Sequence, residues 1–228
     1  HALCELIERD ALTRFQFAST SEVSNAEFRP HGHENSQLLE LLQLIDDARL
    51  HLRMFEMETD LGVPTCMALL QPKHNIHDDE QHSGVNCGGC ASHPDPGRAI
   101  VKAITEAAQA RLALVAGARD DIRAEDYETD TLNSFPKPQD PKLLDKRQFS
   151  AEHMPGWAHC IDLQEHIAEL VRRLANVGIN QVLVADLDTS DFDFEVVRIV
   201  ATQLQVPLQG HRVQITERGL KHVQEQAA

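Results

Sequence analysis

Apolar residues recur every three or four positions in several stretches of the chain, which is the spacing of a helix with one buried face. These predicted helices span 1–17, 37–50, 96–117 and 162–177. Before the third helix, Asp95 can cap the first free N–H groups, Pro96 suits the first helical position, and Gly117 suits the stop. Its buried face is expected to contain Ile100, Ala103, Ile104, Ala107 and Val115.

The second and fourth helices carry longer apolar sets. The inner face of the second is expected to contain Leu38, Leu39, Leu41, Leu42, Leu44 and Ile45. The inner face of the fourth is expected to contain Leu163, Ile167, Leu170, Val171 and Leu174. Shorter apolar runs predict strands at 51–57, 63–71, 181–187 and 195–202, and the run at 181–187 is expected to be buried.

The segments between these elements are polar. Residues 18–35 collect Ser, Asn, Pro and Gly and predict a loop, and residues 119–156 hold several prolines and predict a surface loop or lid. Helices and strands alternate with hairpin-like neighbours, so we predict one domain over 1–228 with an α+β (α/β two-layer) fold, a sheet packed against helices. Neither a dinucleotide-binding glycine motif nor a P-loop occurs, which excludes phosphate binding by those two loops.

The first and third helices repeat one pattern, which suggests an internal duplication. A gapless alignment pairs Glu5 with Glu106 and Glu8 with Gln109. Residues three apart project from the same side of a helix. If the two helices pack side by side, four oxygen-bearing side chains converge, and such ligands suit Mg²⁺ with nucleotide phosphates. The same spacing also fits two amphipathic helices whose Glu residues face water, so the pattern alone leaves both interpretations open.

A Cys-x-x-Cys sequence lies just before the third helix. The set that could hold zinc tetrahedrally is His82, Cys87, Cys90 and His93. The two thiols could also form a redox pair. Since the chain has five cysteines and no second paired cluster, a structural glycine-rich turn is the interpretation that the sequence favours.

Charge excludes some partners. The formal net charge is −15, from 36 acidic and 21 basic residues, which argues against binding to nucleic acid or to an anionic membrane surface. No apolar run approaches transmembrane length. A locally positive or metal-loaded pocket could still bind a nucleotide.

Several of these stretches resemble the YcaO family. The matching stretches are Leu3–Ala11, His93–Pro96, Thr105–Arg111 and Gly117–Asp121, with support from Gly62–Thr65 and Val182–Leu187. The resemblance covers most of residues 1–200. It implies a cytoplasmic, ATP-dependent enzyme that activates a backbone amide of a peptide or protein substrate, as a cyclodehydratase or a thioamide-forming enzyme.

The resemblance also implies cofactors and ligands. The cofactors are ATP and Mg²⁺, and the Mg²⁺ ligands would be Glu5, Glu8, Glu106 and Gln109. The contacts to ATP would be Arg9, Arg111 and Arg119. Arg119 could equally pair with Asp120 or Asp121 at the end of the helix.

Two departures from the family pattern leave a second function class open. His1 stands where family members commonly have Ser, and the chain opens directly in a helix. The tail also lacks the Pro-x-Pro-x-Pro sequence that is common in cyclodehydratases of the family, which counts against that activity. We therefore expect a domain without its N-terminal part that hydrolyses little ATP alone. The alternative is a non-catalytic or accessory module, for example in methylthiolation of a ribosomal protein. The resemblance leaves open a TfuA-like or other partner protein, and a homodimer is an alternative to a monomer.

Overall fold

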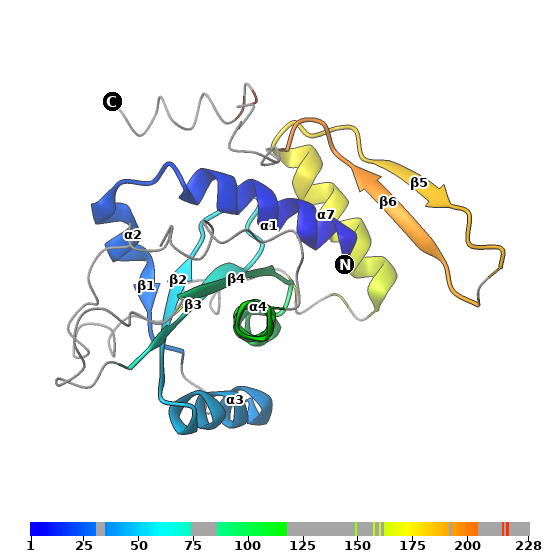
Figure 1. The fold of residues 1–228 in the computed structure, drawn as a ribbon. Coiled ribbons are helices and arrows are strands. Elements are labelled where there is room, and N and C mark those ends of the chain that lie inside the picture. Colours follow the sequence, from blue (N-terminus) through cyan, green and yellow to red (C-terminus); the bar gives the residue numbers. More distant parts are fainter. Residues whose placement is uncertain are drawn as a thin grey trace. The chain divides into compact units, whose positions relative to one another are not determined.

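The computed structural model describes residues 1–30, 35–73, 86–117, 162–191 and 193–204, together with residues 149, 157, 160, 216 and 218. The chain divides into two compact units, which we call the first and the second unit. The first unit comprises His1–Ala18, Glu58–Val63 and Met154–Ala228, and the second comprises Ser19–Met57 and Pro64–His153. Helices and antiparallel sheets are mixed in the chain (Figure 1), which confirms the predicted α+β class. The predicted loop at 119–156 lies outside the described residues, apart from Phe149.

The second unit contains a four-stranded antiparallel sheet in the order β1-β2-β3-β4. Its strands are β1 (Glu27–Phe28), β2 (Leu50–Glu56), β3 (Thr65–Pro72) and β4 (Cys87–Ser92). The strands predicted at 51–57 and 63–71 are therefore confirmed as β2 and β3. Strand β4 is the glycine-containing stretch before the third helix, and it pairs with β3 so that Met67 lies opposite Cys90.

Residues 18–35 are not the continuous loop that the sequence predicted. They contain helix α2 (Thr20–Ala26) and strand β1. The helix begins with a capping box: the side chain of Ser19 accepts a hydrogen bond from the backbone N–H of Glu22, and the Glu22 carboxylate accepts one from the N–H of Ser19. The loop prediction was wrong because these polar side chains satisfy a helix start.

Helices α3 (Ser36–Asp47) and α4 (Pro96–Ala116) pack with one face of this sheet in a shared hydrophobic core. The start of α4 is as predicted, since Asp95 Oδ1 accepts a hydrogen bond of 3.0 Å from the N–H of Arg98. Gly117 ends the helix at a φ of 58°, in the left-handed region that favours glycine.

For both α3 and α4 the sequence predicted more buried residues than the structure shows. In α4 the buried residues end at Ala107, and Val115 is 71% exposed because the last turns of the helix extend past the core. In α3 only Leu38 and Ile45 are buried, while Leu39 and Leu44 are exposed.

The first unit combines α1 (Ala2–Phe15), α7 (Leu163–Asn176) and an antiparallel two-stranded ribbon of β5 (Leu183–Leu187) and β6 (Val196–Val200). Its core is formed by Leu3, Cys4, Ile7, Leu61, Val63, Leu170, Leu174, Ile179, Ala201 and Leu204. The prediction of a buried strand at 181–187 was wrong in one respect: β5 is a strand, but all of its residues are exposed. Leu163, Ile167 and Val171 of α7 are exposed as well.

A buried carboxylate ties α7 to residues 58–63 of the first unit. Glu169 is only 6% exposed, and it accepts hydrogen bonds of 2.6 and 2.7 Å from Arg172 and one of 2.7 Å from Arg173. Arg173 also donates to the carbonyl oxygens of Leu61 and Gly62. The hydrogen bonds from Arg172, together with the hydrogen bond from Arg173, outweigh burial and lower the pKa of Glu169 from 4.5 to about 2.

This pKa predicts acid sensitivity of the first unit. A carboxyl group whose pKa is lower in the folded state stabilises that state above its unfolded pKa, and the contribution is lost as the pH falls through the folded pKa. The free energy of unfolding should therefore decrease between pH 4.5 and about 2. Denaturant titrations at several pH values will measure this slope. Glu169→Gln should lower stability at pH 7 and flatten the slope, and an unchanged slope would contradict the assignment.

Candidate functional site

One half of the predicted site lies on α1 in the first unit. Glu5 and Arg9 are exposed and Glu8 is half-buried. Positions three and four apart share one side of a helix, so α1 presents two carboxylates and a guanidinium together. His1 belongs to the same group, because its Nε2 lies 3.4 Å from Glu5 Oε1 and forms an ion pair when the imidazole is protonated.

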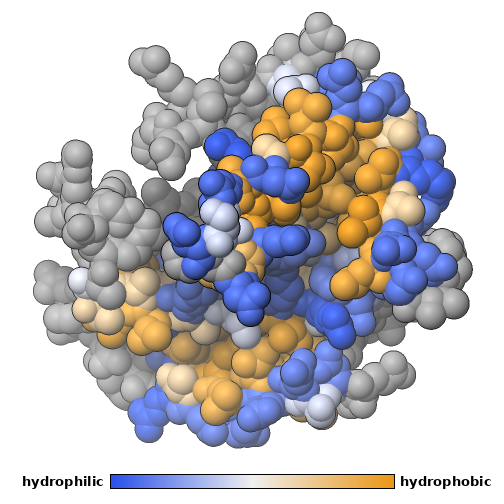
Figure 2. Space-filling model, turned by 90° about the vertical axis from the view of Figure 1, so that its right-hand side faces the viewer, coloured by the Kyte–Doolittle hydropathy of each residue, from blue (hydrophilic) through white to orange (hydrophobic). Residues whose placement is uncertain are grey.

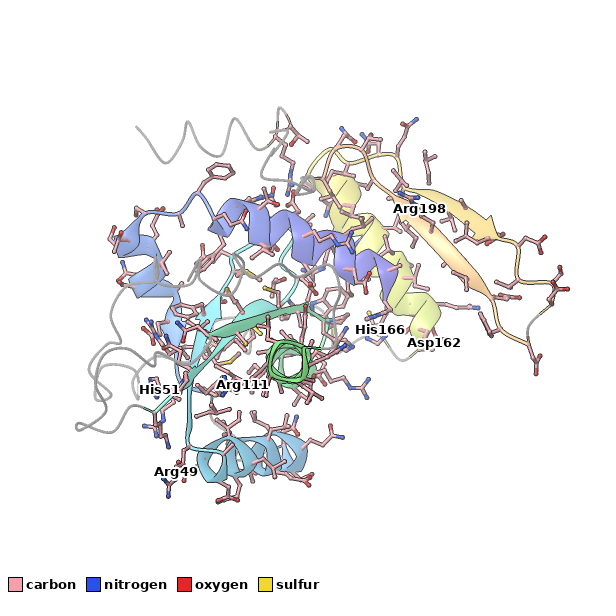
Figure 3. All side chains as sticks on the ribbon, in the orientation of Figure 1. Arg49, His51, Arg111, Asp162, His166 and Arg198 are labelled. Carbon is pink, nitrogen blue, oxygen red and sulfur yellow. The ribbon has the colours of Figure 1, made fainter. Side chains whose placement is uncertain are left out.

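A pocket of about 660 Å³ opens beside α1 within the first unit. Its charged lining consists of Glu5, Arg9 and Arg198. Arg198 projects from β6 (Figure 3), between apolar neighbours on the strand. The sequence analysis missed this residue, although a single charged residue inside the run Val-Val-Arg-Ile-Val was a visible signal. Two guanidiniums beside one carboxylate can hold phosphate oxygens together with a bound cation.

The other half of the predicted site lies on α4 in the second unit. Glu106 and Gln109 are both exposed residues of α4. Glu106 Oε2 accepts a hydrogen bond of 3.1 Å from the backbone N–H of Cys90 on β4. This bond fixes the direction of the Glu106 carboxylate.

The position of Glu106 depends on a glycine of β4. A Cβ atom added to Gly89 would lie 2.3 Å from the backbone nitrogen of Ala107 and 2.4 Å from the carbonyl oxygen of Ala103. Strand β4 and helix α4 therefore approach each other more closely than any residue with a side chain would allow. The close approach brings the Glu106 carboxylate within reach of the Cys90 N–H.

Arg111 lies on α4 (Figure 3) and is half-buried. Its guanidinium interacts with the Cys87 thiol of β4. Burial raises the pKa of Cys87, and the charge of Arg111 and its hydrogen bond to the thiol oppose that rise. Its role in ATP binding stays a prediction, and Arg119 lies outside the described residues.

The predicted zinc or redox pair is not formed by β4. Cys87 lies opposite Leu70, whereas Cys90 lies opposite Met67. Residues three apart in a strand point to opposite faces of the sheet, so the two thiols cannot meet. His93 accepts a hydrogen bond of 2.9 Å at Nδ1 from the N–H of Asp95, and His82 lies outside the described residues. Across the ranges that the structure describes, no group of three or more His, Cys, Asp or Glu residues could hold a metal ion.

Glu5 and Glu8 belong to the first unit, and Glu106 and Gln109 belong to the second. The convergence of these residues on one Mg²⁺ ion stays a prediction. Each half has the chemistry that such an ion needs, since its ligands are exposed or half-buried carboxylate and amide oxygens.

The chain belongs to the YcaO family. The family model that matches residues 1–205 is described as YcaO cyclodehydratase, ATP- and Mg²⁺-binding. This confirms the resemblance seen in the sequence and places the chain in an ATP- and Mg²⁺-binding family.

Two curated proteins are similar in sequence to this chain. Over 225 residues the chain is 32% identical to an uncharacterized protein encoded in the tfuA 3′ region of Rhizobium leguminosarum bv. trifolii, covering 98% of this chain and 53% of that protein. It is 30% identical over 218 residues to an uncharacterized protein of Methanothermobacter thermautotrophicus, covering 90% of this chain and 52% of that protein. The chain therefore spans about half the length of these relatives.

Solved structures show the same fold. The YcaO protein of Methanopyrus kandleri, whose structure was solved with AMPPCP and Mg²⁺, matches with a TM-score of 0.60 and 21% identity over 89% of this chain and 50% of that protein. The heterocyclase TruD matches with a TM-score of 0.58 and 21% identity over 90% of this chain and 27% of that protein.

In the part of the chain that the structure describes, no helix has the length and apolar character needed to cross a membrane.

Proposed function

We propose that this chain carries ATP- and Mg²⁺-binding residues of an enzyme that activates a backbone amide in a peptide or protein substrate. The observation that carries the proposal is the charged lining of the pocket in the first unit, where Glu5 and Arg9 of α1 meet Arg198 of β6. Its volume of about 660 Å³ is within the range of about 300–1,000 Å³ for small-molecule sites. The family assignment supports the same function.

The proposed division of labour follows from the side chains. Glu5 and Glu8 offer carboxylate oxygens to Mg²⁺, and α4 offers the carboxylate of Glu106 and the amide oxygen of Gln109. Arg9 and Arg198 hold phosphate oxygens through their planar guanidiniums. Bound Mg²⁺ supplies positive charge that neutralises the triphosphate. The chain thereby positions ATP and stabilises charge, and it needs no nucleophile of its own.

In the proposed reaction the substrate amide oxygen attacks the γ-phosphorus of ATP, and ADP leaves. A Cys, Ser or Thr side chain of the substrate, or sulfide, then adds to the activated carbon. Loss of a proton and of phosphate leaves an azoline ring or a thioamide. We place the reaction in the cytoplasm, where ATP is available and the five free cysteines would stay reduced. A TfuA-like protein is the partner that the tfuA-linked relative suggests.

A second candidate function is an accessory module without catalysis. The observation that favours it is the ion pair of His1 with Glu5, because a protonated imidazole would compete with Mg²⁺ for this carboxylate. Such a module could support another modifying enzyme, including one that methylthiolates a ribosomal protein.

Titration calorimetry of the chain with ATP, with and without Mg²⁺, tests the proposed site. We expect binding that depends on Mg²⁺ and that is weakened about tenfold by Glu5→Gln, because the substitution removes a charge from a metal ligand (about 1.4 kcal/mol). Glu40→Gln, which changes an exposed glutamate of α3, is the matched control and should have no effect. Binding of ATP that ignores both Mg²⁺ and Glu5→Gln would contradict the proposal.

A further inference from the structure

A second pocket lies within the second unit. It has a volume of about 710 Å³, and none of its described lining residues belongs to the pocket beside α1. Its walls come from α3, from β1 with the two residues that follow it, from β2, and from Lys73 directly after β3. We call it the edge pocket, because β1 and the start of β2 form one edge of the sheet.

The short length of β1 explains where the edge pocket lies. Only Met54 and Phe55 of β2 pair with β1. Pro30, two residues after β1, has no N–H with which to extend the ladder. Among the described residues, no other strand lies on this side of β2. The first part of β2, residues 50–53, therefore borders the pocket where a longer β1 would have paired with it.

One side of the edge pocket is apolar. Leu50 and Leu52 of β2 pack against the core that the sheet shares with α3 and α4. From α3 the pocket is lined by Leu39, Leu42 and Ile45, and Leu39 is 50% exposed. Figure 2 shows apolar side chains gathering at the level of α3. An apolar ligand group placed here would remove such side chains from water, which is favourable.

The other side of the edge pocket is charged. His51, near the start of β2 (Figure 3), and Arg53 alternate with the two leucines, so they lie on the opposite face of the sheet. The buried guanidinium of Arg53 donates two hydrogen bonds of 2.8 Å to the Glu27 carboxylate. Lys73 Nζ forms an exposed ion pair with Asp46. Exposed ion pairs contribute little stability, so Lys73 can exchange this partner for a ligand at small cost.

The charges of the lining favour an anion with a single charge. The permanently charged lining residues are Arg29, Arg53 and Lys73 against Glu27 and Asp46. One positive charge is left over, although the formal net charge of the whole chain is −15. A triphosphate carries several negative charges and would exceed this balance, whereas one carboxylate matches it.

His51 reports the sign of the field inside the pocket. Burial lowers the pKa of His51, and the charges of Arg53 and Lys73 lower it further, while Glu27 opposes them. The cations outweigh the carboxylate at the imidazole, so a bound anion would relieve an unfavourable protonation of this ring.

We propose that the edge pocket is a second ligand site, which takes a small carboxylic acid with an apolar tail. The tail lies between α3 and the leucines of β2, and the carboxylate faces His51 and Lys73. A volume of about 710 Å³ is within the range of about 300–1,000 Å³ for small-molecule sites. The proposal does not depend on nucleotide binding.

Titration calorimetry of the chain with octanoate tests the proposal. We expect saturable binding at one site. Butyrate should bind at least about tenfold more weakly, because its shorter tail removes less apolar surface from water. Octylammonium has the same tail with the opposite charge and should not bind detectably. No binding of octanoate, or equal binding of octylammonium, would overturn the proposal.

Two matched pairs of substitutions locate the binding. Lys73→Gln and Leu39→Ser change the charged and the apolar side of the pocket, and each should weaken octanoate binding about fivefold. Arg49→Gln and Leu44→Ser change an exposed cation and an exposed α3 leucine that do not line the pocket, and neither should have an effect. Thermal unfolding of the four variants checks that each one folds. Equal effects within a pair would place the binding elsewhere and would also overturn the proposal.

The pH dependence gives a readout that packing alone would not produce. A bound carboxylate favours the protonated imidazole, so octanoate should raise the pKa of His51. By linkage, octanoate should bind more tightly at about pH 5.5 than at about pH 7.5, and His51→Gln should abolish this difference. NMR of labelled histidines measures the pKa, and the same variant assigns the resonance. An unchanged pKa of His51 at saturating octanoate would contradict the site. None of these readouts requires ATP, so a failure of the proposed function remains distinguishable.

Discussion

Gly89→Ala will destabilise the second unit far more than Gly88→Ala. At Gly89 the new methyl group would lie 2.3 Å from the backbone nitrogen of Ala107, and the backbone of α4 cannot yield without moving the whole helix from the sheet. At Gly88 the nearest atom is the terminal Cε of Met67 at 3.3 Å, which can rotate away. Overpacking costs about 1–3 kcal/mol, and we expect Gly89→Ala to lie at the upper end.

Denaturant unfolding of the two variants and of the unchanged protein measures this difference. Adding one methyl group to adjacent glycines of β4 alters intrinsic strand propensity alike, so the comparison isolates the contact with α4. Gly89→Ala should also break the hydrogen bond from the Cys90 N–H to Glu106, because α4 must move. Equal stability of the two variants would show that helix and strand separate at little cost.

The local features of the fold could be predicted from the sequence. The Asp95 cap, Pro96 at the first position and the Gly117 stop act through neighbouring residues, so the bounds of α4 followed from them. Helix α2 could have been found in the same way, since Ser19 and Glu22 have the spacing of a capping box. The loop prediction relied on the polar composition of residues 18–35 and overlooked the spacing of Ser19 and Glu22.

Burial was harder to predict, because an apolar run shows which residues can be buried and not which polypeptide covers them. Leu183 and Val184 of β5 were expected inside and are exposed. Leu163 and Ile167 of α7 were also predicted to be buried, and they are exposed. Each of these errors falls on β5 or α7 of the first unit, where the described residues leave apolar side chains exposed.

Helical spacing could predict which residues of the candidate site share one side of the same helix. The gapless repeat placed Glu5 with Glu8, and Glu106 with Gln109, each pair on one side of its helix. Spacing could not reveal that Glu106 is held by the Cys90 N–H, because that bond depends on the close approach at Gly89. Arg198 was missed for a related reason, since only the packing of β6 places it in one pocket with Arg9.

Arg198→Ala should lower the affinity of the chain for ATP by about 10- to 100-fold. Hydrogen bonds to charged groups contribute about 1.5–3 kcal/mol, and each 1.4 kcal/mol corresponds to about a tenfold change in affinity. Arg198 is exposed in a pocket with a second guanidinium, so removing it takes away half of the positive charge in the lining. Folding should be unaffected, because Arg198 lies outside the core of the first unit.

Arg198→Lys separates the charge from the geometry. A lysine keeps the positive charge and loses the planar pair of N–H donors, so its affinity for ATP should fall between those of the unchanged protein and Arg198→Ala. Arg49→Ala removes an exposed arginine of the second unit (Figure 3) and controls for the change in net charge. Calorimetry with ATP and Mg²⁺ measures all four proteins. If Arg198→Ala and Arg49→Ala bind ATP equally well, the phosphates are held elsewhere, and the role proposed for Arg198 is wrong.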